Sequence, residues 1–412
     1  MLKRALALAG VSALFAVAGV AQEAGSGFAM PVTASFGVMD THRFDLSDAT
    51  ASPVAANFRL MLYPTLRLGK HWFAYAAVQV RRLPYFYYDA YLTERGVHTD
   101  LIQGYVGYTL HSGEAAVVFK AGQMTSAFGS FPLRYDDQEN PLMDQPLSYI
   151  SELPIRSDQL SCGAKDLLNQ YYGWVWAGCG GVAGWGPGLT PVTLYGLPAV
   201  QAETSVRRFD ARVQMTASSP AYPDGWHISR QYLQWTAGGG FTVQQGFRVG
   251  VSGFRGPYLD DEVAPWLPVG TTVRSFPASG LGLDVQWARG RLSATGELQA
   301  FRFDAPNFVV PPRILSGYAE LKVRLTPRFY AAVREGFLKT EPVLDSQGVA
   351  ASEFAPALQT TEVGVGCWLH PRVLAKVSYE FAQSAGSAGS MNNVLGMQVV
   401  ASFRQLQQAF GH

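Results

Sequence analysis

Polar and apolar residues alternate along most of the chain. In the stretch 373–383, Lys376, Ser378 and Glu380 are separated by apolar residues, and the stretches 208–216 and 291–303 show the same pattern. Successive side chains of a β-strand point to opposite faces, so a period of two predicts strands with one polar and one apolar face. An amphipathic helix has a period of 3.6 residues and cannot keep this register.

Sixteen segments with this character follow one another, which predicts an all-β fold. An even number of antiparallel strands with one lipid-facing side is typical of transmembrane β-barrels. We therefore predict a transmembrane antiparallel β-barrel of about 16 strands. The predicted strands are 31–39, 54–67, 71–82, 98–110, 114–123, 190–204, 208–216, 230–241, 246–254, 279–288, 291–303, 313–325, 328–338, 359–369, 373–383 and 393–403.

The connections between these strands are alternately short and long. Those after even strands are tight, as at Gly69-Lys70 and Arg289-Gly290, whereas 124–189 is the longest of those after odd strands. Membrane barrels combine short periplasmic turns with longer outer loops. A soluble β-sandwich need not have two such unequal ends, and a β-helix would show a fixed repeat that is absent here.

The N-terminus has the pattern of a signal peptide. Lys3 and Arg4 precede an apolar run over 5–20, and the small residue Ala21 follows. This predicts a signal peptide at 1–21, and hence export, with the barrel formed by 22–412. After Ala21 there is no run of about 18 apolar residues, which excludes helical membrane spans.

Composition and charge fit this interpretation. Charged residues are only 15% of the chain, against about 25% in typical soluble domains. The net charge of +1 argues against a nucleic-acid partner. Aromatic residues near strand ends are expected in girdles at the lipid headgroups; they are Trp72, Phe73, Tyr75, Tyr85, Phe86, Tyr87, Tyr88, Trp287, Phe301, Phe303, Phe329, Tyr330 and Trp368.

Charged residues on the polar face are predicted to line a pore. A basic residue on the lipid face would cost about 2–4 kcal/mol at the bilayer midplane, whereas water in the lumen of a wide barrel solvates charges. These residues therefore either are solvated and pair across the wall or set ion selectivity together. The basic candidates are Arg59, Arg67, Arg81, Lys120, Arg212, Arg248, Lys322, Arg324, Arg334 and Lys376, and the acidic ones are Asp210, Asp284, Glu297, Glu320, Glu362 and Glu380.

The first half of the longest connection contains a recognisable series of residues. Gly122-Gln123, Phe128-Gly129, the stretch from Arg134 to Asn140-Pro141, and Pro146-Leu147 resemble the phosphate-selective porin O/P-like superfamily of Gram-negative outer membranes. The resemblance implies a third outer loop that folds into the lumen and narrows it, and a homotrimer. It makes Arg134, Asp136, Asp137 and Glu139 the constriction-loop candidates, whose mixed charge leaves the solute open.

The cysteines and the acidic clusters allow further hypotheses. In an oxidising periplasm the close pair Cys162 and Cys179 is a disulfide candidate, and Cys367 is expected to be a small lipid-facing residue. Clustered carboxylates favour hard cations such as calcium, and the two acidic clusters are Asp136, Asp137, Glu139 and Asp144, and separately Asp260, Asp261 and Glu262. Their spacing matches no defined calcium loop, so solvated loop charges are the preferred interpretation, and no metal or cofactor is predicted.

These features together predict a porin-like channel for passive diffusion of small hydrophilic solutes, with a modest preference for anions. No Gly-x-Ser-x-Gly, His-Glu-x-x-His or P-loop motif is present, so no enzyme is predicted. The segment 394–403 resembles the closing-strand signal that the barrel-assembly machinery reads, which makes this machinery and outer-membrane lipid expected partners. The alternatives are a phospholipase-like outer-membrane enzyme and a secreted soluble β-protein that binds carbohydrate.

Overall fold

The computed structural model describes residues 27–40, 54–86, 96–171, 179–181, 188–192, 196–217, 233–384 and 392–403. The predicted signal peptide, 1–21, lies outside the described residues. Within them, no helix is both long and apolar enough to cross a membrane.

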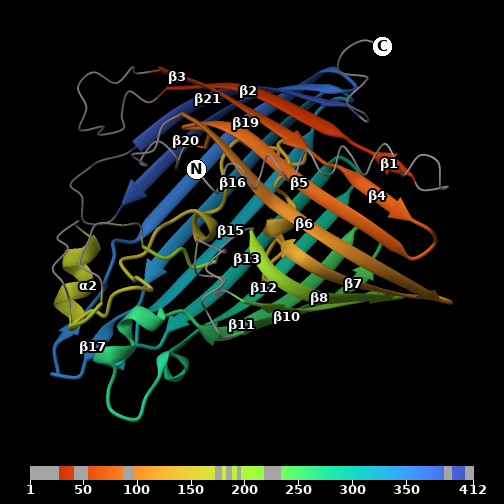
Figure 1. The fold of residues 1–412 in the computed structure, drawn as a ribbon. Helices are drawn as coiled ribbons and strands as arrows, with labels where there is room; N and C mark the ends of the chain where they lie inside the picture. The colour runs from red at the N-terminus through yellow and green to blue at the C-terminus, as the bar shows by residue number, and fades with distance from the viewer. Residues whose placement is uncertain are drawn as a thin grey trace.

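One antiparallel sheet closes on itself (Figure 1). Strands that follow one another along the chain pair, and the last strand pairs with the second segment, β2. The sheet has eighteen segments. Because β1 and β2 are one strand interrupted at Met30-Pro31, and β3 and β4 one strand interrupted at Tyr63-Pro64, sixteen barrel strands result among the described residues. The predicted barrel and its strand number are confirmed.

The strand bounds agree with the predicted segments to within a few residues, with one exception. The segment 190–204 begins as a strand only at Leu197, because Leu189 exchanges backbone hydrogen bonds with Leu153 and Ile155 in the preceding loop. The bounds are β1 Phe28–Ala29, β2 Val32–Asp40, β3 Val54–Leu62, β4 Thr65–Leu68, β5 Trp72–Leu83, β6 Gly96–Ser112, β7 Ala115–Met124, β8 Leu197–Val206, β9 Phe209–Thr216, β10 Gln234–Gln244, β11 Phe247–Pro257, β12 Pro277–Arg289, β13 Leu292–Phe303, β15 Arg313–Arg324, β16 Phe329–Thr340, β19 Leu358–His370, β20 Val373–Ser384 and β21 Asn392–Phe403.

The two ends of the barrel differ as predicted. At one end, tight turns join neighbouring strands, and Gly246 (φ +79°) and Gly290 (φ +61°) provide the left-handed backbone that such turns need. At the other end, long connections fold together. Three short strands, β14 (Phe308–Val310), β17 (Val343–Asp345) and β18 (Ala350–Ala351), form a small sheet there.

The long connections share an apolar core with the neighbouring strand ends. Phe303, Tyr258 and Phe354 are among its buried side chains. The helix α2 (Ala164–Tyr171) lies beside this sheet (Figure 1), and Cys162 and Cys179 form a disulfide with Cα atoms 4.8 Å apart. The described parts of the long connections therefore fold into one packed unit rather than a set of separate loops.

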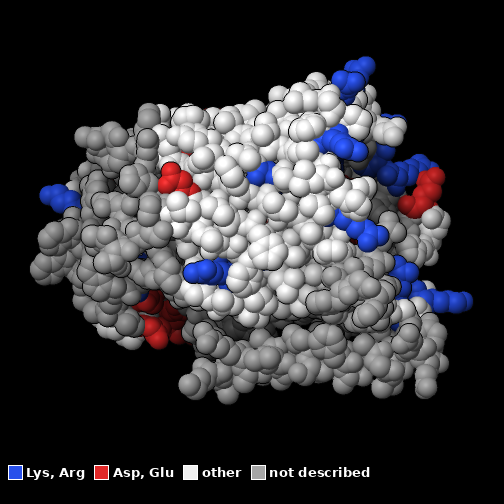
Figure 2. Space-filling model, turned by 90° about the horizontal axis from the view of Figure 1, so that it is seen from above, with Lys and Arg blue, Asp and Glu red and all other residues white. Residues whose placement is uncertain are grey.

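The outward face of the barrel is apolar and the inward face is polar. Figure 2 shows a broad uncharged band, with basic side chains gathered at the end that carries the tight turns. Phe36, 65% exposed, points outward, while its neighbour Ser35 is buried inside. Cys367 lies opposite Phe329, which is also exposed, so this cysteine shares the outward face as expected.

The prediction for the aromatic girdles is wrong for part of its set. Trp72 and Phe329 are exposed on the outward face, but Tyr75, Phe301 and Tyr330 point inward. Successive side chains of a strand point to opposite faces, so consecutive aromatic residues cannot all lie on the lipid-facing side. Tyr85, Phe86, Phe303 and Trp368 likewise contact buried side chains of the interior, and Tyr87 and Tyr88 lie outside the described residues.

Candidate functional site

The connection after β7 lies against the inward face of the barrel wall. We call its residues 125–160 the inserted loop; it contains the 3-10 turns η2 (Phe131–Leu133) and η3 (Leu147–Tyr149). In Figure 1 this yellow segment lies among the strands of the barrel, and its backbone bonds to side chains of β13, β16, β19 and β20. Gln214 of β9 also bonds to the loop backbone at Ala127 and Thr125, and three larger groups of contacts attach the loop to the rest of the wall.

The first attachment is the carboxylate of Glu297 on β13. The backbone N–H groups of Ser130 and Phe131 donate to Oε1 at 3.0 and 2.7 Å, and the Ser130 hydroxyl donates to the same atom at 2.8 Å. The Tyr149 hydroxyl donates to Oε2 at 2.6 Å. One buried wall residue therefore holds both 3-10 turns of the inserted loop.

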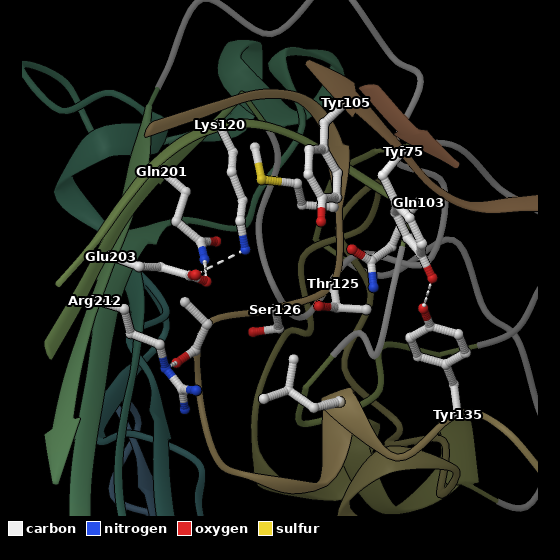
Figure 3. Close-up of a pocket in the computed structure, with 13 residues that line it drawn as sticks. Tyr75, Gln103, Tyr105, Lys120, Thr125, Ser126, Tyr135, Gln201, Glu203 and Arg212 are labelled. Atoms are coloured by element: carbon white, nitrogen blue, oxygen red, sulfur yellow. Dashed lines mark hydrogen bonds and ion pairs between the residues drawn. The ribbon is translucent and has the colours of Figure 1, made fainter. Parts of the chain in front are cut away.

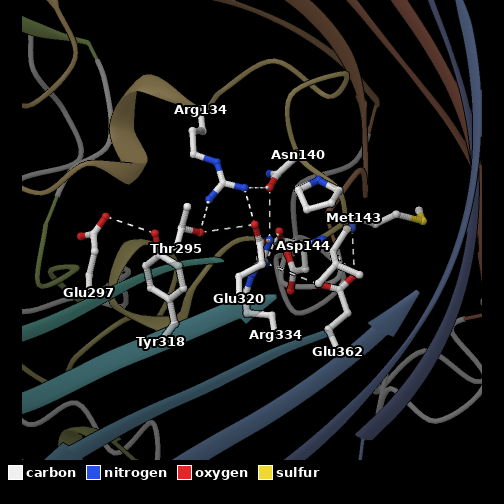
Figure 4. A network of polar contacts seen from close by, with 12 residues as sticks. Arg134, Asn140, Met143, Asp144, Thr295, Glu297, Tyr318, Glu320, Arg334 and Glu362 are labelled. Atoms are coloured by element: carbon white, nitrogen blue, oxygen red, sulfur yellow. Dashed lines mark hydrogen bonds and ion pairs between the residues drawn. The ribbon is translucent and has the colours of Figure 1, made fainter. Parts of the chain in front are cut away.

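The second attachment is a charge network around Arg334 on β16 (Figure 4). Arg334 bonds to Glu320 at 2.7 Å and to the carbonyl oxygen of Asp144 at 2.6 Å. Arg134 of the loop donates to the other oxygen of Glu320 at 2.6 Å. Glu362 accepts from the backbone N–H of Met143 at 2.8 Å. Positive and negative groups therefore alternate along this network, from Arg134 of the loop through Glu320 and Arg334 to Glu362 of the wall.

The third attachment surrounds Asp137 of the loop. Arg59 Nη1 lies 3.0 Å from its Oδ1, and the hydroxyls of Ser35 and Tyr85 each donate to its Oδ2 at 2.7 Å. Lys376 Nζ donates to the carbonyl oxygen of Asp137 at 2.9 Å. Burial raises the pKa of the Asp137 carboxyl, but the charges of Arg59 and Lys376 outweigh this effect and hold the pKa below its ordinary value.

The low pKa of Asp137 predicts a pH dependence. Its contribution to loop attachment is fully present above the unfolded pKa, about 3.9, and is lost as pH falls through the lower pKa of the folded state. At pH 7 we expect D137N to show larger fluctuations of single-channel current than the wild type. As pH falls below the unfolded pKa and through the lower pKa of the folded state, the wild type should approach the noise of the variant. A difference that stays constant from pH 7 to pH 2 would contradict this role.

On the opposite side of the lumen, the loop and the wall leave a cavity of about 170 Å³ (Figure 3). Strands β5 to β9 form its wall, and residues 124–135 form its other side. Its polar lining residues are Tyr75, Gln103, Tyr105, Lys120, Thr125, Ser126, Tyr135, Gln201, Glu203 and Arg212.

Two cations and one carboxylate dominate this cavity. Lys120 Nζ lies 2.8 Å from Glu203 Oε2 and 5.3 Å from the centre of the Tyr105 ring. Arg212 Nε donates to the carbonyl oxygen of Ala127 at 2.8 Å, so this guanidinium also touches the loop. The cavity therefore carries a net positive formal charge, with an aromatic face beside Lys120.

The structure places all sixteen charged candidates on the inward face, as their cross-strand registers show. Only Lys120 and Arg212 line the cavity. The expected solvation is wrong for half of the set, because the inserted loop or neighbouring side chains cover them. The buried members are Arg59, Asp284, Glu297, Glu320, Arg334, Glu362, Lys376 and Glu380.

Three of the four constriction-loop candidates contact the wall, and none of the four lines the cavity. Arg134 pairs with Glu320, Asp136 accepts a hydrogen bond from Thr33 at 2.9 Å, and Asp137 is buried. The loop residues in the cavity lining are instead Thr125, Ser126 and Tyr135, with the apolar residues Ala127 and Leu133, none of which was a candidate from the sequence. Glu139 is exposed.

Four wall residues of the cavity were not pore candidates from the sequence, although the sequence around two of them indicates that they face inward. The four are Tyr75, Tyr105, Gln201 and Glu203. Gln201 and Glu203 alternate with apolar residues in a predicted strand, which marks them as inward-facing. Tyr75 and Tyr105 belong to strands that contain more than one aromatic residue. Nothing in the local sequence indicates which part of the wall the loop leaves uncovered.

The acidic clusters do not form a metal site in the part of the chain that the structure describes. The expected solvated loop charge is wrong for Asp137 and Asp144, which are buried against wall residues. Asp261 and Glu262 are exposed, as expected, and Asp260 accepts a hydrogen bond from Ser157.

Solved structures share this fold at low sequence identity. The outer membrane channel DcaP of Acinetobacter baumannii superposes with a TM-score of 0.54 and 9% identity, over 92% of this chain and 97% of its own. OprB of Pseudomonas putida superposes with a TM-score of 0.51 and 14% identity, over 93% of this chain and 95% of its own. An anion-selective porin from Comamonas acidovorans superposes with a TM-score of 0.50 and 10% identity, over 92% of this chain and 99% of its own.

No protein-family model and no curated protein matches the sequence. The likeness to these structures shows the barrel fold, and the resemblance to the phosphate-selective superfamily stays a prediction.

Proposed function

We propose that this chain is a passive channel of the Gram-negative outer membrane, through which small hydrophilic solutes diffuse with a modest preference for anions. One observation carries the proposal. The inserted loop is attached to the wall by Glu297, Arg334 and Asp137, while on the side of β5 to β9 it leaves a polar cavity. The inserted loop would then act as the constriction, with Lys120 and Arg212 facing the passing solute.

Further support comes from the proteins of the same fold, one of which is an outer membrane channel and another an anion-selective porin. On this proposal residues 1–21 direct export, the barrel-assembly machinery reads the closing strand, outer-membrane lipid surrounds the outward face, and the protein assembles as a homotrimer.

The test is the ion selectivity of single channels in planar bilayers. Wild-type channels should conduct and give a reversal potential in a salt gradient that indicates a preference for anions. In K120Q/R212Q only the carboxylate of Glu203 remains at the cavity, so the preference should invert to cations with a several-fold change in permeability ratio.

The matched control is R208Q. Arg208 is an exposed basic residue in the turn between β8 and β9, outside the cavity, so its removal should leave the preference nearly unchanged. A wild-type protein that is folded and inserted but shows no unitary conductance would contradict the proposal. So would an equal shift in both variants.

A further inference from the structure

Four basic side chains form a patch on the outward face at the long-loop end of the barrel. They are Arg255 of β11, Arg302 of β13, Arg313 of β15 and Lys339 of β16, and we call them the outer basic patch. Each lies within a few residues of the end of its strand that leads to, or comes from, a long connection.

Their neighbours establish that these side chains point outward. Arg302 stands between Phe301 and Phe303, which are both buried on the inward side, and its own side chain is 48% exposed. Arg255 is paired across the ladder with Trp235, which is 56% exposed. The patch is therefore part of the surface that faces lipid, not of the pore.

Strand register brings the four side chains together. Ser279 of β12 lies opposite both Arg255 and Arg302, and Arg302 lies directly opposite Arg313. Lys339 lies opposite Leu315, which is the next outward residue of β15 after Arg313. The patch thus extends across five neighbouring strands.

The charges of the patch are only partly balanced. Arg302 Nε lies 2.6 Å from Asp304 Oδ1, but Arg313 Nη1 lies 3.9 Å from Glu341 Oε2. Within the described part of the chain, neither Arg255 nor Lys339 has an ion pair. Like charges directly opposite each other on paired strands, such as Arg302 and Arg313, destabilise a sheet, and here Asp304 and Glu341 offset them. Two carboxylates against four basic side chains leave the patch with a net formal charge of +2, which an anion can balance.

The position of the patch indicates what this anion is. Directly next to it, towards the tight-turn end, the outward residues are apolar, among them Leu281, Ala300 and Phe337. An apolar band marks the hydrocarbon region, so the patch stands at headgroup level. Guanidinium groups match phosphate oxygens in a bidentate geometry, and arginine is enriched where phosphate is recognised.

We propose that the outer basic patch binds the phosphate groups of phosphorylated glycolipids in the outer leaflet. This inference rests on the proposed outer-membrane location. The patch is confined to one sector of the barrel, because the outward residues at the same end of β8, β9 and β19 are neutral, namely Pro198, Met215 and Gln359. On β5 the outward-facing Arg82 is a single charge.

The experiment compares the binding of two lipids to the full-length protein in detergent, by native mass spectrometry. One probe is a bisphosphorylated glycolipid, and the other is the same lipid without its phosphates. Wild-type protein should bind the phosphorylated probe preferentially. R302Q/R313Q should bind it about thirtyfold more weakly, since each basic residue near an anionic lipid surface contributes roughly a factor of five.

Two further variants keep the test specific. R302K/R313K retains both charges and should remain within about fivefold of the wild type. R289Q/R328Q removes two exposed basic residues at the tight-turn end and should bind as the wild type does. Heat-modifiable gel migration establishes that each variant has a folded barrel.

Several results would overturn the inference. These are equal binding of the two probes, an equal loss in R289Q/R328Q, displacement of the lipid by inorganic phosphate at a similar concentration, or a change of oligomeric state in R302Q/R313Q without a change in lipid binding. The double variant should conduct like the wild type, because the patch is outside the pore. Loss of lipid preference is therefore distinguishable from failure of the channel proposal, which the wild-type conductance tests.

Discussion

The E297A variant should give a larger and noisier single-channel current than the wild type. The carboxylate of Glu297 accepts hydrogen bonds from the backbone N–H groups of Ser130 and Phe131 and from the hydroxyl of Tyr149. A buried donor left without a partner costs about 1–3 kcal/mol, so the two N–H groups alone would weaken this attachment by about 2–6 kcal/mol. The freed loop would then leave more of the lumen open. Planar-bilayer recordings measure this directly.

The control for this prediction is E335A. Glu335 on β16 also accepts hydrogen bonds from neighbouring side chains, Gln359 and Thr361, but it lies on the outward face. Its loss should leave conductance unchanged. Limited proteolysis adds a second readout, because cleavage within 125–160 should become faster in E297A only. A folded E297A barrel with wild-type conductance and wild-type cleavage would show that Glu297 does not position the loop.

Much of the barrel follows from the sequence because its determinants are local. The alternation of Lys376, Ser378 and Glu380 with apolar residues fixes which face of a strand each side chain occupies, and the structure agrees. Tight turns need few residues and favour glycine, so the unequal ends of the barrel are also visible in the sequence.

The candidate site follows from the sequence only in part, because its contacts are distant along the chain. Ser130 and Glu297 are 167 residues apart, and no local pattern links them. Sequence reasoning therefore placed Glu297 on the inward face but expected it to be in water. It also expected Asp137 to narrow the pore, whereas Arg59, 78 residues away, binds this carboxylate at the wall.

The residues of the cavity could likewise be predicted from the sequence only in part. Lys120 and Arg212 could be assigned to the inward face from alternation, but so could fourteen other charged residues. What distinguishes these two is that the inserted loop leaves a cavity beside the wall of β5 to β9, whereas it packs closely against the wall from β13 to β20. The position of the loop depends on contacts between residues far apart along the chain, such as Phe131 with Glu297 and Asp137 with Lys376.

Replacing Arg334 by alanine should cause the largest loss of stability among single substitutions in the wall. Arg334 is 3% exposed and bonds to Glu320 at 2.7 Å, to Glu362 at 3.4 Å and to the carbonyl oxygen of Asp144 at 2.6 Å. Its removal leaves the buried carboxylate of Glu362 without its ion pair and Glu320 with Arg134 alone. Breaking a buried ion pair in this way costs about 3–5 kcal/mol. Unfolding in denaturant, followed by gel migration, measures the loss.

Two further variants separate charge burial from packing. R324A removes an exposed inward arginine at the turn end of the adjacent strand β15, so it should lower stability by at most about 0.5 kcal/mol. R334A/E362Q should recover part of the loss, because a neutral amide at position 362 requires no buried counter-charge. If the double variant is less stable than R334A, packing and not charge pairing is what Arg334 contributes. If it recovers, the network that attaches the inserted loop also explains why so many charges can be buried in the lumen of this barrel.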